Sequence, residues 1–82
     1  MKIKYFAWVK NITNTDSEDI NDTTINDINS LKNFLCYKYP KLTAYILKDN
    51  IIRIAINLEY TTTNEKISSK DEVALFPPVS GG

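Results

Sequence analysis

The sequence has no histidine and a single cysteine, and these two absences remove most of the common catalytic and metal-binding side-chain sets. Histidine is the commonest general base and the commonest neutral metal ligand. Without it, neither a Ser–His–Asp set nor a Cys–His pair can form, and zinc sites of the usual kinds are excluded. Cys36 lies alone in an amphipathic segment and is expected to be an inert structural thiol. We therefore predict no metal site, no bound cofactor and no side-chain catalyst within this chain.

Glycine and net charge are also scarce. The sequence has 82 residues, and its only two glycines are the last two, so no phosphate-cradling glycine loop can form elsewhere. Ten basic and ten acidic residues cancel, which argues against nonspecific binding to nucleic acid. No apolar run has the length of a signal peptide or a membrane span, and one cysteine fits a reducing compartment. We expect one soluble, cytoplasmic domain with no membrane partner.

Two segments before the middle of the chain have clear periodicity. Residues 2–10 alternate, with Ile3 and Tyr5 on one side and Phe6 and Trp8 on the other, which predicts a strand. A helix is expected to begin after Asp27, whose carboxylate can accept a free backbone N–H, and to end near Tyr39 because Pro40 cannot continue it. Its apolar residues recur at helical spacing and would face a sheet: Ile28, Leu31, Phe34 and Leu35.

Strand patterns return in the second half. The run at 51–60 predicts one strand with alternate residues from Ile52 to Tyr60 on one face. The run at 72–77 predicts a last strand that Pro77 and Pro78 end, because neither can donate to a ladder. A short strand near 18–25 is also expected, whereas 41–50 fits either a short helical turn or a strand. The predicted class is α+β, with one main helix on one face of a small mixed sheet.

The end of the sequence, "FPPVSGG", reads as a projecting tail on a domain that spans 1–76. Pro77 and Pro78 would hold the root of the tail stiff. After Ser80, Gly81 and Gly82 carry no Cβ, so channel walls and a nucleophile could approach the terminal carbon from all sides. We interpret 77–82 as a flexible tail that delivers its terminal carboxylate into the active site of another protein. A frayed end is the alternative.

Three aromatic side chains of the end strands, Phe6, Trp8 and Phe76, would project away from the predicted core. Exposed aromatics often mark protein interfaces, so we predict that these residues bind a partner. The alternative is that a second layer of the same chain covers them.

The stretch "DEVALFPPVSGG", 71–82, resembles the ending of the small, sulfur-carrying subunit of molybdopterin synthase. That family ends in an acidic pair, a hydrophobic strand, Phe-Pro-Pro, a small spacer and Gly-Gly, and all of these are present. The opening "KYFAWVK" and the stretch "IAIN" with Asn57 resemble its first and central strands. Two departures are that "SSKD" replaces a Gly-Asp turn before the last strand and that Asn11 replaces an acidic residue.

The resemblance implies the β-grasp fold of ubiquitin, with the first and last strands side by side at the centre of the sheet. It also implies that a ubiquitin-activating-like enzyme uses ATP to adenylate Gly82, and that a sulfurtransferase system converts it to a thiocarboxylate. The large synthase subunit would then supply the catalytic groups while the carrier gives its sulfur to cyclic pyranopterin monophosphate, forming the dithiolene of molybdopterin. The chain itself would be a sulfur donor in a two-subunit transferase, a heterotetramer of two carriers and two large subunits.

Three alternatives stay open at this point. One is a thiocarboxylate carrier for thiazole synthesis or tRNA thiolation, although the Phe-Pro-Pro root favours the molybdopterin branch. Another is a ubiquitin-like modifier whose Gly82 forms an isopeptide with a lysine. The last is a plain interaction domain with an incidental tail.

Overall fold

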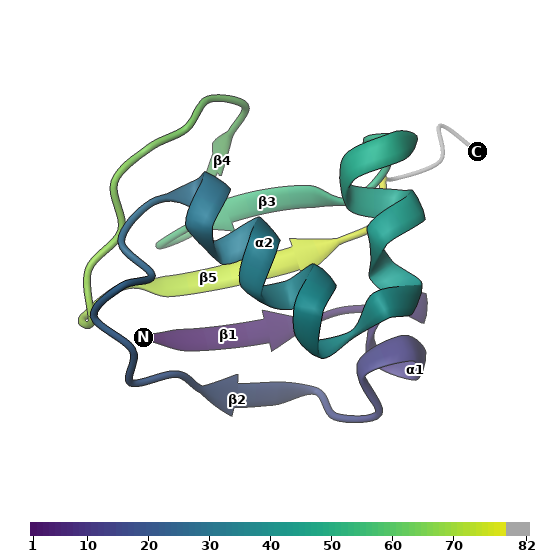
Figure 1. Cartoon of the computed structure of the whole chain (residues 1–82), viewed down its shortest axis with the longest axis horizontal. Helices are drawn as coiled ribbons and strands as arrows, with labels where there is room; N and C mark the ends of the chain where they lie inside the picture. Colours follow the sequence, from purple (N-terminus) through teal and green to yellow (C-terminus); the bar gives the residue numbers. More distant parts are fainter. Residues whose placement is uncertain (79–82) are drawn as a thin grey trace.

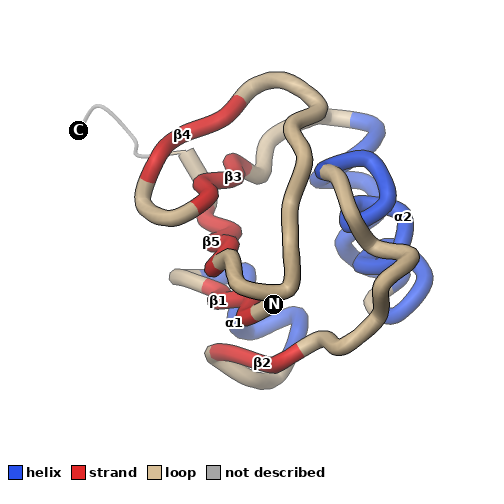
Figure 2. Tube along the Cα trace, turned by 90° about the vertical axis from the view of Figure 1, so that its left-hand side faces the viewer, coloured by secondary structure: helices blue, strands red, loops and turns tan. Residues whose placement is uncertain are grey.

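A five-stranded mixed sheet forms the body of the molecule, and its strands lie in the order β2-β1-β5-β3-β4 (Figure 1). The computed structural model describes residues 1–78. The elements in chain order are β1 (Lys2–Tyr5), α1 (Trp8–Thr13), β2 (Ser17–Asp19), α2 (Ile28–Lys38), the 3-10 helix η1 (Pro40–Leu42), the π-helix η2 (Ala44–Lys48), β3 (Arg53–Ile56), β4 (Glu59–Thr61) and β5 (Glu72–Phe76). The α2 helix crosses one face of the sheet (Figure 2).

The last strand of the sequence occupies the middle of the sheet. β5 pairs in parallel with β1, with Lys2 opposite Glu72 and Tyr5 opposite Leu75. It pairs antiparallel with β3 on its other side, where Arg53 lies opposite Phe76. The predicted α+β class and the adjacency of the first and last strands are therefore confirmed.

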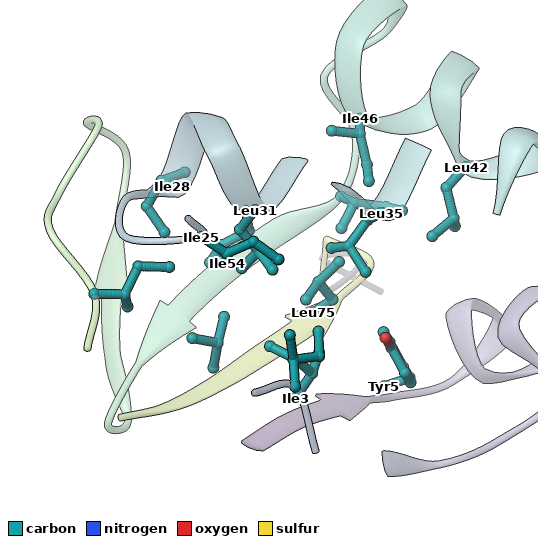
Figure 3. Close-up of a cluster of buried hydrophobic side chains, with 14 of the residues drawn as sticks. Ile3, Tyr5, Ile25, Ile28, Leu31, Leu35, Leu42, Ile46, Ile54 and Leu75 are labelled. Atoms are coloured by element: carbon teal, nitrogen blue, oxygen red, sulfur yellow. The ribbon is translucent and has the colours of Figure 1, made fainter. Parts of the chain in front are cut away.

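The hydrophobic core lies between α2 and the sheet (Figure 3). Side chains alternate across a strand, so one face of β1 and β5 points to the helix. The side chains that are fully buried there come from both layers: Ile3, Tyr5, Val73 and Leu75 from the sheet and Leu31 and Leu35 from α2. Burial of these side chains is what stabilises the packing of the helix on the sheet, at about 1.5–3 kcal/mol for each large aliphatic residue.

The α2 helix begins and ends as the sequence predicts. Asp27 is the N-cap, and its Oδ1 accepts a hydrogen bond of 2.8 Å from the N–H of Ser30. The Ser30 hydroxyl accepts in return from the N–H of Asp27 at 3.1 Å, which completes a capping box. The helix ends at Lys38, and Pro40 starts the next, tighter turn.

The first predicted strand is too long, because the backbone turns at Ala7. Ala7 has φ 53° and ψ −134°, so β1 ends at Tyr5 and the next residues form α1. Alternation of aromatic and β-branched side chains does not report such a break, and Val9 becomes fully buried from a helix instead of a strand. Ala7 thus carries a conformation that costs a residue with a Cβ of order 1–3 kcal/mol.

The predicted strand at 51–60 is in fact a hairpin. Asn57 and Leu58 have φ 50° and φ 70° and form a two-residue turn between β3 and β4. Ile54 is buried as expected, but Leu58 at the tip of the turn is 90% exposed. A turn with positive φ at both positions fits the twist of a hairpin, and asparagine tolerates this conformation well.

The remaining connections use no glycine within residues 1–78. Within 41–50 the chain is helical rather than extended, through η1 and η2, which end at Lys48. The strand expected near 18–25 is shorter and earlier, because β2 spans only Ser17–Asp19. Asn14 and Asn50 adopt positive φ, as Asn57 does, in places where glycine is common. Among residues 1–78, no helix is both long and apolar enough to cross a membrane.

Glu18 of β2 accepts three hydrogen bonds, one from β1 and two from the end of α2. Its Oε2 accepts from the buried hydroxyl of Tyr5 at 2.6 Å and from the hydroxyl of Tyr39, and its Oε1 accepts from Lys38. Partial burial acts to raise the pKa of Glu18, but the bonds from Lys38, Tyr39 and Tyr5 outweigh it and hold this pKa below 4.5, its ordinary value. Burial and the same carboxylate raise the pKa of Tyr5 far above its usual range.

Candidate docking face and tail root

The end of β5 fixes the point from which the predicted tail leaves the domain. Leu75 accepts a hydrogen bond of 3.0 Å from the N–H of Phe6, and Phe76 lies opposite Arg53 of β3, so the strand is held from both sides. Pro77 is half-buried, Pro78 is exposed, and both lie beyond the end of the strand. The root of the tail is therefore set by the middle strand of the sheet.

The predictions for Ser80, Gly81 and Gly82 of the tail concern residues outside the described range. So does any test of the flexibility predicted for 77–82, because the structure is described only to Pro78. All of these stay predictions.

The start of β5 is braced by the turn of the β3–β4 hairpin. The amide of Asn57 donates to Asp71 Oδ1 at 2.9 Å, and its Oδ1 accepts from the N–H of Glu72 at 2.9 Å. Asp71 also accepts from the N–H of Ser68 at 2.8 Å, and these backbone and amide bonds lower the pKa of the Asp71 carboxyl. The Asp71 N–H donates in turn to the carbonyl of Ser68 at 3.1 Å. The segment "SSKD" thus closes a tight turn before β5 without glycine.

The sheet face opposite α2 bears an aromatic pair next to the tail root. Leu75 points into the core, so Phe76 points to the other face. Its ring lies 6.3 Å from that of Tyr60 of β4, measured between centroids, at an interplanar angle of 57°. Phe6 follows β1 beside the end of β5 and is 47% exposed. On the same face, Lys4 and Glu72 form an ion pair of 3.5 Å.

Trp8 does not belong to this face. The expectation that it projects from a strand together with Phe6 and Phe76 is wrong, because Trp8 begins α1. Its ring packs against Tyr45 of η2, with centroids 4.9 Å apart, and it lies against the core. Tyr45 of the same chain therefore covers part of the Trp8 side chain, and the prediction that Trp8 binds a partner stays a prediction.

Tyr60 and Leu58 are the exposed residues that sequence reasoning misplaced. Tyr60 is 55% exposed and Leu58 is 90% exposed, whereas one strand over 51–60 would have put both on the inward face. Reading Asn57–Leu58 as a two-residue turn would have separated them from Ile54, and asparagine at the first turn position was the available signal.

The described residues offer no preformed metal site. No group of three or more cysteine or carboxylate side chains that could hold an ion occurs within residues 1–78, and the sequence has no histidine.

Comparison with known proteins identifies the family. The ThiS family profile matches residues 3–82. The chain belongs to the ThiS family. A relative from Dictyostelium discoideum named molybdopterin synthase sulfur carrier subunit is 36% identical to this ThiS-family chain over 88 residues, covering 99% of the chain and 94% of the relative. The protein of the same name from Escherichia coli (strain K12) is 27% identical over 82 residues, covering 100% and 99%.

A solved structure confirms the fold of this ThiS-family chain. The crystal structure of SAMP1 from Haloferax volcanii matches it with a TM-score of 0.82 and 26% identity, covering 100% of the chain and 98% of SAMP1. The ubiquitin-like β-grasp expected from the resemblance is therefore correct, and so is the family to which the ending "FPPVSGG" pointed.

Proposed function

We propose that this chain is the sulfur carrier subunit of a molybdopterin synthase. The observation that carries the proposal is the match over almost the whole chain to proteins of that name. The position of β5 supports it, since the segment that carries the predicted tail begins directly after the central strand of the sheet, which ends at Phe76.

The reactive group of the carrier is the terminal carboxylate of Gly82. A carboxylate lacks a good leaving group, so an adenylating enzyme first joins it to the α-phosphate of ATP and releases pyrophosphate. The terminal sulfur of a sulfurtransferase persulfide then displaces AMP to form an acyl disulfide, and a thiol reductant cleaves its S–S bond to release the thiocarboxylate. Gly81 and Gly82 suit this step because neither has a Cβ that would obstruct a narrow channel.

The acceptor of the sulfur is cyclic pyranopterin monophosphate on the large subunit. Two carriers each donate one sulfur to form the dithiolene, and each returns to the carboxylate form after water cleaves its bond to the pterin. The large subunit supplies the acid and base groups, which fits a carrier sequence without histidine.

The sheet face opposite α2, around Phe76, is the surface on which the large subunit and the adenylating enzyme dock. Phe76, Tyr60 and Phe6 gather beside the tail root, and aromatic residues are enriched in the cores of protein interfaces. Anchoring at Phe76 would fix the distance from the partner surface to Gly82.

Deletion of Gly82 tests the chemistry. We expect the shortened chain to keep its fold by circular dichroism and to lose all formation of molybdopterin when mixed with the large subunit, the adenylating enzyme and a sulfur source. Intact wild-type carrier should become heavier by the difference between sulfur and oxygen in mass spectrometry. Two outcomes would refute the proposal: pterin sulfuration that persists when Gly82 is deleted, and pterin sulfuration that persists when an alanine is added after Gly82.

Phe76→Ala tests the docking face, with Tyr37→Ala as the matched control. Tyr37 is 86% exposed on α2, which covers the opposite face of the sheet. We expect Phe76→Ala to weaken binding to the large subunit about tenfold or more, as truncation of an aromatic anchor does. Tyr37→Ala should leave this binding unchanged in the same calorimetric titration. Equal effects of the two variants would place the interface elsewhere.

A conjugating modifier is the second candidate. The likeness to SAMP1, whose full name is small archaeal modifier protein 1, favours it. Gly82 would then form an isopeptide bond with a lysine of a target protein after the same adenylation. Ladders of high-mass species in a cell lysate, detected with an antibody to this chain and absent with the Gly82 deletion, would support conjugation.

A further inference from the structure

Arg53 of β3 lies directly beside Phe76 on the sheet face opposite α2. Ile52 and Ile54, on either side of Arg53 in the sequence, are both buried in the core, so the Arg53 side chain points to the other face. Arg53 and Phe76 are opposite each other in the antiparallel β3–β5 pair, where Cβ atoms lie about 4.5–5.5 Å apart. Arg53 therefore borders the aromatic pair that Phe76 forms with Tyr60.

The guanidinium of Arg53 is held at the end of the sheet from which the predicted tail continues. Its Nη1 donates a hydrogen bond of 3.2 Å to the carbonyl of Asn50, which precedes β3. Because β3 and β5 are antiparallel, the start of β3 lies beside the end of β5, where Phe76 is followed by Pro77. The bond uses one N–H group, and the planar guanidinium carries several more donors that can bind a partner.

Arg53 has no salt bridge within the part of the chain that the structure describes, in contrast to another cation of the same face. Lys4 is neutralised by Glu72 in an ion pair of 3.5 Å, and the other described salt bridge lies at the end of α2. Arg53 is half-buried, and the acceptor that it binds is a neutral carbonyl. Its positive charge is thus partly removed from water without an acidic side chain of the described residues to compensate it, which favours pairing with an external anion.

We propose that Arg53 binds a carboxylate of the large subunit and is a specificity-determining neighbour of the Phe76 anchor; this inference rests on the proposed function. A guanidinium pairs with a carboxylate in a bidentate and directional manner. Arginine and tyrosine are also enriched among the interface residues that contribute most to binding, and Arg53 lies next to both Phe76 and Tyr60. The matching surface of the large subunit has an apolar pocket for Phe76 with an acidic side chain at its edge.

This ion pair fixes the orientation of the carrier on its partner. A single aromatic anchor leaves the carrier free to turn about the contact, and turning changes the direction in which the chain leaves the sheet at Pro77. A directional contact from Arg53, one strand away from the anchor, removes that freedom. Complementary charges across an interface also raise the rate of association, and salt screens this effect.

Stopped-flow association with the large subunit, at low and at high sodium chloride, tests the pairing. We expect Arg53→Gln to weaken binding about tenfold at low salt. Its association rate should also fall less steeply with added salt than that of wild type. Lys32→Gln is the matched control, since it removes one positive charge from α2, on the opposite side of the sheet, and should leave the affinity unchanged.

Two more substitutions of Arg53 separate its charge from its geometry. Arg53→Lys should keep part of the affinity, because it keeps the charge and loses the planar fork. Arg53→Glu should weaken binding about a hundredfold, because it places two carboxylates side by side. Circular dichroism should show the same fold for every variant, so that a loss of binding reports the interface.

The outcomes distinguish this inference from the docking face on which it rests. If Phe76→Ala weakens binding while Arg53→Gln and Arg53→Glu bind as wild type does, the pairing of Arg53 is refuted and the docking face stands. Equal losses for Arg53→Gln and Lys32→Gln would also refute the pairing, since they would show only a general effect of charge. If neither Phe76→Ala nor Arg53→Glu changes binding, the docking face itself is wrong.

Discussion

Replacing Glu18 by glutamine should lower the free energy of unfolding by about 2–3 kcal/mol at pH 7. The carboxylate accepts from Tyr5, Tyr39 and Lys38, and its side chain is 15% exposed. Glutamine can turn its one carbonyl oxygen toward the two hydroxyls, but these bonds then lose their charge, at about 1 kcal/mol each. Its NH₂ group then faces the Lys38 ammonium, and this lost pair adds at most about 1 kcal/mol because Lys38 is largely in solvent.

Urea denaturation followed by the fluorescence of Trp8 measures this change, since Trp8 lies partly buried against the core. The matched control is Glu59→Gln. Glu59 is exposed, and its side chain has no hydrogen bond or salt bridge among residues 1–78, so this variant should stay within about 0.5 kcal/mol of wild type.

The pH dependence gives a second measurement of the same Glu18 site. The folded protein holds the pKa of Glu18 below its ordinary value of 4.5, so the unfolded chain binds more protons in this range. The stabilisation is therefore complete above pH 4.5 and is lost as the pH falls through the lowered pKa. The difference in the free energy of unfolding between wild type and Glu18→Gln should therefore decrease as the pH falls. The reasoning would be refuted if Glu18→Gln were as stable as Glu59→Gln at pH 7, or if the difference in free energy of unfolding between wild type and Glu18→Gln increased at low pH.

Three further stability changes follow from the backbone and the core. Ala7→Gly should raise the free energy of unfolding by about 1 kcal/mol in thermal or urea melts, because Ala7 has φ 53° and glycine has no Cβ to clash there. Leu58→Gly should raise the free energy of unfolding by a similar amount, about 1 kcal/mol, since φ is 70° in a turn that prefers glycine. A fall in the free energy of unfolding would contradict this expectation. Leu31→Ala should destabilise by about 2–5 kcal/mol, whereas Leu47→Ala, at a site that is 54% exposed, should change little.

Local rules predicted the elements that local chemistry controls. The α2 helix was bounded correctly because Asp27 caps it and Pro40 cannot continue it, and both effects act within one turn. The last strand was also right, since alternation over 72–76 ends at two prolines. The two long strand predictions failed where single residues, Ala7 and Leu58, adopt positive φ. Side-chain periodicity carries no information about such positions when the residue is not glycine.

The candidate site also has features that the sequence predicts and features that it does not. The ending "DEVALFPPVSGG" pointed to the family by resemblance, and the ThiS family profile over residues 3–82 confirms it. Phe76 could be assigned to the outer face because one strand is enough to define two faces. Tyr60 could not, since its contact with Phe76 depends on where the β3–β4 hairpin turns and how it pairs with β5.

The sequence by itself determined the class of the fold, the main helix, the final strand and the chemical character of the tail, because each depends on neighbours within a few residues. Only the tertiary structure decided that Trp8 packs against Tyr45 and that Glu18 accepts hydrogen bonds from three donors. Glu18 and Tyr39 lie 21 positions apart in the sequence. The packing of α2 on the sheet brings these two residues together, and no local sequence pattern predicts their contact.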